Sequence, residues 1–229
     1  MPRKFYCLLP ALLLVALLAG PAHAARVVAE TAPGFEPPRP AKVALIPPMA
    51  IPIPEGTGWI SCPIAGEAFV PCVVGDAAEA ELSSALAAAL ATVPGMEPTP
   101  QAEINAALAR LKAKHPEGFG LDGKWQTELA REAGADYALA GFIYCWRDKS
   151  GGSYASESPA SIAFCLHLIE VSSGRIMWRM RYEDEQKPLF EDLLSIGTFI
   201  RRGGKWISSA EMAREAAAEM KRKLPWSKP

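Results

Sequence analysis

The residues best suited to covalent, redox or metal chemistry are the four cysteines and two histidines that lie after residue 24, which leaves out Cys7 and His23 near the N-terminus. Two of the cysteines, Cys62 and Cys72, are separated by nine residues, which is longer than the C-x₂₋₄-C spacing of zinc ribbons. His115 precedes a proline, and His167 alternates with apolar neighbours as a packed strand residue does. The sequence contains neither an H-E-x-x-H zinc motif nor a G-x-S-x-G nucleophile motif. These patterns predict no catalytic residue, no metal site and no cofactor.

The same four cysteines are candidates for disulfide bonds. An even number of cysteines in an exported chain is typical of a disulfide framework, and four cysteines allow three pairings, among which sequence alone does not choose. The pairing we expect is Cys62–Cys72, which ties off a short loop, together with Cys145–Cys165. The second bridge would link two antiparallel strands at positions that face each other.

The N-terminal segment 1–24 has the three parts of a secretory signal peptide. Arg3 and Lys4 precede an apolar run, and Ala22-His23-Ala24 provides a cleavage site. The apolar run of about 16 residues is shorter than the roughly 20 needed for a membrane anchor. A lipoprotein signal would carry a cysteine where this chain has Pro21. We therefore expect a periplasmic or secreted protein without a lipid anchor and without an integral membrane span after cleavage.

Length and charge limit the domain organisation and the partners. Removing 24 of 229 residues leaves 205, with 22 basic and 25 acidic residues and a formal charge of −3. This length fits one domain, and the absence of a basic stripe argues against nucleic acid as a partner. We expect a Pro-rich linker at 25–41 and a single domain at 42–229 with a cysteine-containing insertion at 47–75. The insertion is either an ornament that needs a disulfide or a recognition loop.

Hydrophobic periodicity predicts an α/β (α+β) fold, with helices packed on a mixed sheet whose C-terminal part is three antiparallel strands. A Ser173-Gly174 turn should join the last two of these strands and place His167 opposite Met180. Ser208 and Glu211 form a capping box at the start of the last helix. The expected strands are 42–46, 137–146, 161–171 and 176–182, and the expected helices begin near residues 76, 100, 124, 187 and 208.

Candidate partner surfaces are aromatic residues in loop contexts and one apolar segment. Aromatic side chains in glycine-rich loops are typical interface anchors. The segment 189–200 is apolar over a wide arc, so it either covers an open sheet face or docks a partner. The residues singled out on these grounds are Trp59, Phe69, Leu189, Phe190, Leu194 and Trp206.

The order of motifs over residues 42–183 resembles a known envelope superfamily. The strand 42–47 and the helix 76–91 come first, followed by the run Ala-Gly-Ala-Asp-Tyr-Ala-Leu-Ala-Gly at 133–141 and by Ser-Gly-Arg-Ile-Met-Trp at 173–178. This order is similar to that of the curli secretion channel protein, the outer-membrane lipoprotein activators of penicillin-binding proteins and the N-terminal domain of the Tol–Pal propeller protein. The resemblance implies an α/β domain that binds other envelope proteins without catalysis. No pore-forming amphipathic hairpins are visible, and the stretch 184–229 lies outside the resemblance.

Three hypotheses about function follow from these observations. The first is an exported periplasmic accessory or adaptor protein, not an enzyme, that binds cell-envelope proteins or a second copy of itself. The second is a small-ligand or glycan-binding protein that uses tryptophans as a stacking surface. The third is an enzyme with carboxylate chemistry, for which a deep pocket with two facing carboxylates would be required.

Overall fold

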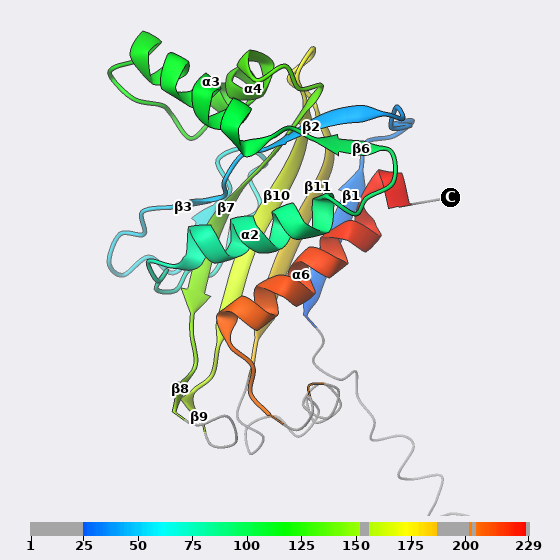
Figure 1. Cartoon of the computed structure of the whole chain (residues 1–229). Coiled ribbons are helices and arrows are strands. Elements are labelled where there is room, and N and C mark those ends of the chain that lie inside the picture. Colours follow the sequence, from blue (N-terminus) through cyan, green and yellow to red (C-terminus); the bar gives the residue numbers. More distant parts are fainter. Residues whose placement is uncertain (1–24, 152–155, 187–201, 203–204, 228–229) are drawn as a thin grey trace, which may run out of the picture.

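The computed structural model describes residues 25–151, 156–186, 202 and 205–227, and its main feature is one mixed β-sheet (Figure 1). Antiparallel pairing joins β1 to β11, β11 to β10 and β10 to β7, whereas β7 and β2, β2 and β6, and β3 and β7 are parallel. The predicted fold class and the antiparallel C-terminal part are thus confirmed. In sheet order the strands are β1 (Arg26–Thr31), β11 (Ile176–Glu185), β10 (Ser161–Glu170), β7 (Tyr137–Arg147), β2 (Ala41–Leu45) and β6 (Met96–Pro98), with β3 (Met49–Ala50) beside β7.

Helices cover one face of the sheet and one of its ends. α2 (Ala78–Leu90) and α6 (Ser209–Lys223) lie side by side across one face, and α3 (Gln101–Lys114) and α4 (Lys124–Glu132) lie at the end near β2 (Figure 1). The leucines of α2 recur every four residues and are all buried, as the periodicity predicts. The remaining elements are β4 (Ile60–Ser61), β5 (Ala68–Phe69), β8 (Ser150–Gly151), β9 (Ser156–Ser158) and a 3₁₀ turn at Pro225–Ser227.

Strand β1 occupies part of the chain that the sequence predicts to be a linker. Its side chains alternate, with Val27 and Ala29 packed against the main core and Arg26 and Glu30 pointing outward. Glu30 forms an ion pair with Arg179 on β11 at 2.6 Å. Residues 26–31 therefore belong to the folded domain, because they complete the edge of the sheet beside β11.

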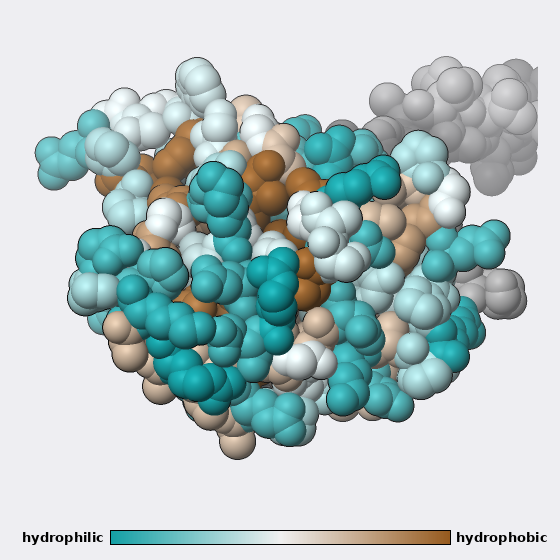
Figure 2. All heavy atoms as spheres, turned by 90° about the horizontal axis from the view of Figure 1, so that it is seen from above, coloured by the Kyte–Doolittle hydropathy of each residue, from teal (hydrophilic) through white to brown (hydrophobic). Residues whose placement is uncertain are grey.

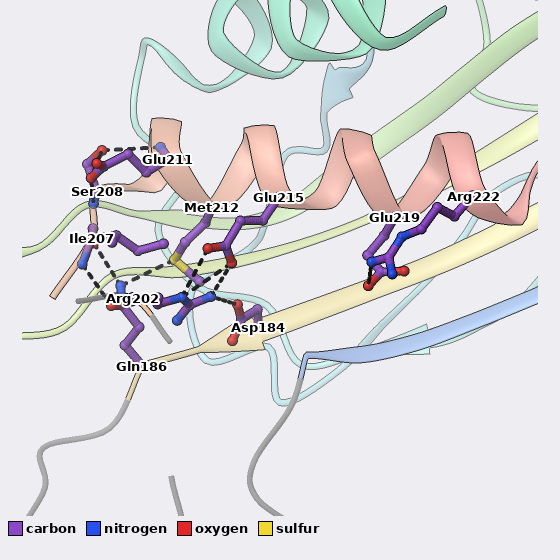
Figure 3. Close-up of polar contacts among 10 residues, drawn as sticks. All are labelled: Asp184, Gln186, Arg202, Ile207, Ser208, Glu211, Met212, Glu215, Glu219 and Arg222. Carbon is purple, nitrogen blue, oxygen red and sulfur yellow. Dashed lines mark hydrogen bonds and ion pairs between the residues drawn. The ribbon is translucent and has the colours of Figure 1, made fainter. Parts of the chain in front are cut away.

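Polar contacts fix the last helix to strand β11 (Figure 3). The predicted capping box is present, since the Ser208 side chain accepts from the Glu211 backbone and the Glu211 carboxylate accepts from the Ser208 backbone. Arg202 is bound on one side by Asp184, at the end of β11, and on the other by Glu215 of α6, each at 2.6 Å. Burial raises the pKa of the Asp184 carboxyl above its ordinary value, although Arg202 opposes this shift.

Strand registers differ from those predicted. Five residues, 171–175, connect β10 to β11, and Gly174 among them has a φ of 70°. The backbone N–H of Glu170 donates to the Arg175 carbonyl oxygen. His167 therefore lies opposite Arg179 instead of Met180. The starts of two helices also differ slightly from the predicted ones, since α2 begins at Ala78 and α3 at Gln101, and neither helix has a side-chain cap.

Two predicted features lie outside the described residues: the signal peptide at 1–24 and the helical segment that begins near residue 187. Within the part of the chain that the structure describes, no helix is both long enough and apolar enough to cross a membrane.

Candidate functional site in the segment 47–75

The segment 47–75 covers the sheet face opposite α2 and α6. On β7 and β10, side chains such as Ile143 and Phe164 pack toward the helices, whereas Phe142 and Cys165 point to the other face and contact this segment. The backbone of the segment follows β7, since Ile51 donates to the Ile143 carbonyl at 3.2 Å and Cys72 donates to the Tyr144 carbonyl at 3.0 Å. The insertion is thus an ordered layer of the domain.

Aromatic packing anchors the hairpin of β4 and β5 within this layer. The Phe69 ring stacks on Tyr144 with centroids 3.9 Å apart, and the Arg181 guanidinium lies over the Phe69 ring at 4.1 Å from its centroid. Arg181 also donates to the Ala68 carbonyl. Phe69 is only 1 % exposed, so this predicted partner-surface residue instead belongs to the core that holds the hairpin in place.

The disulfide of the structure joins Cys72 to Cys145, so the predicted pairings Cys62–Cys72 and Cys145–Cys165 are wrong. The physical reason is the register of β7 against β10, which pairs Cys165 with Phe142 and not with Cys145, together with a bulge in β7. Cys145 lies opposite Ala163 and Ile143 lies opposite Phe164, so Tyr144 is an extra residue without a cross-strand partner. Cys145 is therefore displaced from Cys165 and lies beside Cys72, with the two Cα atoms 4.5 Å apart.

The other two cysteines lie together with a histidine in the core beneath the hairpin. The Cys62 Sγ is 3.4 Å from the Cys165 Sγ and 3.1 Å from His167 Nε2, and the Cys165 Sγ is 3.2 Å from the same nitrogen. Cys165 and His167 are two residues apart on β10 and so share one face of the strand, while Cys62 follows β4. We call Cys62, Cys165 and His167 the thiol–imidazole cluster; all three residues are buried.

Neighbouring groups polarise this cluster. The hydrogen bond from Cys165 and the contact with His167 lower the pKa of the Cys62 thiol to about 3, although burial opposes the shift. Burial raises the pKa of Cys165 well above its ordinary value. The Tyr144 hydroxyl lies 3.2 Å from the Cys165 Sγ, and burial raises the pKa of that phenol, so it stays protonated and can donate. The cluster thus combines one thiolate with several hydrogen-bond donors.

A thiolate 3.1 Å from an imidazole could in principle act as a nucleophile and base pair. A nucleophilic cysteine must meet its substrate, and reactive cysteines are accordingly at least partly exposed. Cys62 is only 2 % exposed, and His167 is wholly buried under the hairpin. The cluster is therefore closed to a substrate, and its geometry supports a structural or ion-binding role in place of covalent catalysis.

The outer surface of the segment 47–75 carries large apolar side chains that are exposed to solvent. Trp59 and Val70 flank the pair Ile60–Phe69 at the open end of the hairpin, and they are 66 % and 74 % exposed. Because Phe69 points into the core, its neighbours along the strand point outward. Val73, beside the disulfide, is 78 % exposed. A groove of about 570 Å³ adjoins them, lined by Pro52, Pro54, Pro71, Cys72, Val73 and others of residues 50–57 and 71–74. We call Trp59, Val70 and Val73 the exposed apolar surface.

A second hollow, of about 430 Å³, lies at the end of the sheet that carries α4. Its lining combines Ile64, Ile169 and Ile176 with Glu128 and Arg131. Figure 2, which looks onto this end of the molecule, shows apolar patches surrounded by hydrophilic residues. The lining also holds a second carboxylate, Asp122. Asp122 lies 2.8 Å from Lys124 Nζ and Glu128 lies 3.8 Å from His115 Nε2, so each carboxylate already has a neighbouring basic group.

The other predicted partner-surface residues are placed as follows. Trp206 is 8 % exposed and packs beneath the start of α6, so its ring is not available to a partner. Leu189, Phe190 and Leu194 lie outside the described residues. Sequence reasoning missed the exposed valines and the thiol–imidazole cluster. The signal for the cluster was the pair Cys165 and His167, whose two-residue spacing on a strand places them on one face.

No protein-family model matches the chain, and no curated protein matches it. Among solved structures, the chain is similar to the PelC dodecamer from Paraburkholderia phytofirmans, with 16% identity, a TM-score of 0.49, and coverage of 90% of this chain and 99% of that one. It is also similar to the LpoB C-terminal domain from Escherichia coli, with 17% identity, a TM-score of 0.41, and coverage of 68% and 88%. For lipoprotein GNA1162 from Neisseria meningitidis these values are 12%, 0.37, 72% and 97%.

These likenesses concern the course of the backbone. A lipoprotein is among the structures to which the chain is similar, and the particular superfamily indicated by the sequence motifs stays a prediction. The functional argument therefore depends on the residues of the segment 47–75.

Proposed function

We propose that this protein is a non-catalytic accessory protein of the cell envelope that binds a partner protein through the exposed apolar surface. The observation that carries the proposal is the exposure of Trp59, Val70 and Val73 on one ordered segment. Of the four large apolar side chains that are exposed in the described part of the chain, these are three. A tryptophan flanked by smaller apolar residues is the typical composition of the energetic centre of a protein interface.

The rigidity of the segment supports a binding role for its exposed apolar side chains. The Cys72–Cys145 disulfide, the Phe69–Tyr144 stack and the backbone bonds to β7 all fix the segment before a partner arrives. A surface that is already ordered loses little conformational entropy on binding, so more of the contact energy appears as affinity. The groove, with its proline lining, offers a complementary partner a recess at Val73.

Two features support a location outside the cytoplasm. A structural disulfide persists in oxidising compartments such as the periplasm and is rare in the cytosol. The N-terminal residues 1–24 have the composition of a secretory signal, which we predict to be cleaved.

The alternative of a glycan-binding protein has less support. A stacking surface would need several accessible tryptophans, and in the described structure Trp59 is exposed and Trp125 is partly exposed. The remaining tryptophans are buried: Trp146, Trp178, Trp206 and Trp226.

The test is site-specific photo-crosslinking in cells, followed by affinity measurement. A photoreactive residue replaces Val70 in one strain and Val28 in a control strain, because Val28 is exposed on β1 outside the segment. We expect one envelope protein to be captured from position 70 and not from position 28. The captured protein is then purified, and its binding to wild type and to Trp59→Ser is compared by calorimetry.

Loss of a central tryptophan of an interface costs about 2 kcal/mol or more, so we expect Trp59→Ser to weaken binding by about 30-fold. Val28→Ser is the matched control and should leave the affinity unchanged. Equal capture from both positions, or an affinity that Trp59→Ser does not alter, would contradict the proposed surface.

A further inference from the structure

The thiol–imidazole cluster contains the donor atoms of a metal site. Two thiols and one imidazole nitrogen lie within 4.8 Å of one another, and each can supply one ligand atom. Nitrogen and sulfur donors bind Zn(II) and Cu(I), whereas Ca(II) and Mg(II) prefer oxygen. We propose that Cys62, Cys165 and His167 form a buried binding site for a thiophilic transition-metal ion, Zn(II) or Cu(I).

The distances between the donor atoms fit such an ion after a small expansion. With Zn–S bonds of about 2.3 Å and Zn–N bonds of about 2.0 Å, tetrahedral ligands lie about 3.6–3.8 Å from one another. The three separations in the structure are 3.1, 3.2 and 3.4 Å. Each donor must therefore move by a few tenths of an ångström, which a small rotation of the cysteine side chains provides.

The fold holds the donors in place on independent elements. Cys165 and His167 point from the same face of β10, a central strand with neighbours on both sides. Cys62 belongs to the hairpin, where its backbone N–H donates to the Glu67 carbonyl at 2.7 Å. A metal ion at this point would link the hairpin to the sheet, as structural metal sites link segments that are distant in sequence.

Glu67 distinguishes the two candidate ions. It lies on the hairpin with Cys62, whose backbone N–H donates to the Glu67 carbonyl oxygen. Its Oε2 atom is buried and has no hydrogen-bond partner among the described residues, although Oε1 lies 3.3 Å from Arg179. Zn(II) in a structural site takes four ligands, whereas Cu(I) is satisfied by soft ligands in lower number. The three-donor cluster therefore suffices for Cu(I), whereas Zn(II) needs a fourth donor, and the buried, unpartnered Oε2 of Glu67 is the group to test for that position.

A disulfide between Cys62 and Cys165 is the competing chemistry. The two Sγ atoms are 3.4 Å apart and would have to approach to about 2.05 Å, which would remove both thiolate ligands. The two outcomes exclude each other in one molecule, so they can be told apart by the thiol count and by mass.

The experiment uses the full chain after export, purified with the Cys72–Cys145 disulfide intact and kept free of oxygen. Zn(II) and Cu(I) are titrated separately in competition with chromophoric chelators, and bound metal is counted by elemental analysis. We expect one ion per chain. Cys62→Ser should weaken binding of either ion at least 100-fold, and Glu67→Gln should weaken binding of Zn(II) alone. The Cys72→Ala/Cys145→Ala variant, which lacks the other cysteine pair, should retain the site.

A readout on the wild-type chain keeps the test valid if a variant does not fold. Co(II) added to the metal-free protein should give the intense thiolate-to-metal charge-transfer bands of a cysteine-ligated site. Three results would overturn the proposal: no stoichiometric binding by folded protein with two titratable thiols, Co(II) spectra without thiolate bands, or a Cys62–Cys165 disulfide in the freshly isolated protein. None of these results bears on the photo-crosslinking test of the exposed apolar surface.

Discussion

Reduction of the Cys72–Cys145 disulfide is expected to destabilise the protein strongly. The bond closes a loop with a sequence separation of 73 residues. In the chain-entropy model a loop of this length lowers the conformational entropy of the unfolded chain by about 15 cal/mol/K, which corresponds to about 4.4 kcal/mol at 25 °C. The predicted Cys62–Cys72 bridge would have closed a loop of about ten residues and contributed only about 2.7 kcal/mol in the same model. The size of the effect therefore distinguishes the two pairings.

The assay is urea unfolding with and without reductant, followed by tryptophan fluorescence. A domain of this size has a denaturant slope of about 2–3 kcal/mol per molar urea, so the midpoint should fall by about 1.5–2 M when the bond is reduced. Cys72→Ala/Cys145→Ala should unfold at the lower midpoint under both conditions. Cys62→Ser, measured without metal, should retain the full response to reductant.

The reasoning would be refuted by a double variant that still responds to reductant. That result would show that another bond, not Cys72–Cys145, constrains the unfolded chain. Loss of the response to reductant in Cys62→Ser would likewise refute the reasoning, because it would support the Cys62–Cys72 bond predicted from sequence.

Three further predictions concern the sheet and the last helix. Gly141→Ala should destabilise the protein by about 3 kcal/mol or more in urea unfolding, because a Cβ there would lie 2.0 Å from the Cys165 carbonyl oxygen. Ser208→Ala should cost about 1 kcal/mol in the same assay through loss of the helix cap. The hydrogen bond from the Ser208 backbone lowers the pKa of Glu211. The stability that the ionised Glu211 carboxylate contributes is therefore present above the ordinary carboxyl pKa, and it is lost as the pH falls through the pKa of the folded state. Wild type should therefore be more stable than Glu211→Gln at pH 7, and acid titration of stability should remove this difference.

The helices and the central strands could be predicted because their signals are local. The leucines of α2 and the alternation along β11 report burial of one face within a few residues of sequence, and the apolar run of β10 reports a strand buried on both faces. Strand β1 could not be predicted in this way. Its stability comes from pairing with β11 and from the ion pair between Glu30 and Arg179, partners about 150 residues away, while its own flanking sequence is rich in proline.

The buried cluster was hidden for a similar reason. Cys62 and Cys165 are separated by 103 residues, so no spacing motif could connect them. A metal-ligand search over short spacings finds pairs within one loop, and here only Cys165 and His167 are close in sequence. The predicted role of His167 as a buried strand residue is confirmed, but its neighbours depend on how the hairpin folds back over β10.

The bulge in β7 explains why the Cys72–Cys145 disulfide could not be predicted from cysteine spacing or from strand alternation. Strict alternation would place Cys145 on the same face as Ile143, toward α2 and α6, and Trp146 on the face of Tyr144. The extra residue Tyr144 reverses this order, so Cys145 joins the core under the segment 47–75 and Trp146 joins the core under the helices. The bulge thus places two consecutive residues on this face, and both anchor the segment: the Tyr144 ring stacks on Phe69, and the Cys145 sulfur is bonded to Cys72. Because bulges re-aim side chains where a function needs them, the bulge and the exposed apolar surface that it holds are best understood as one feature of the site.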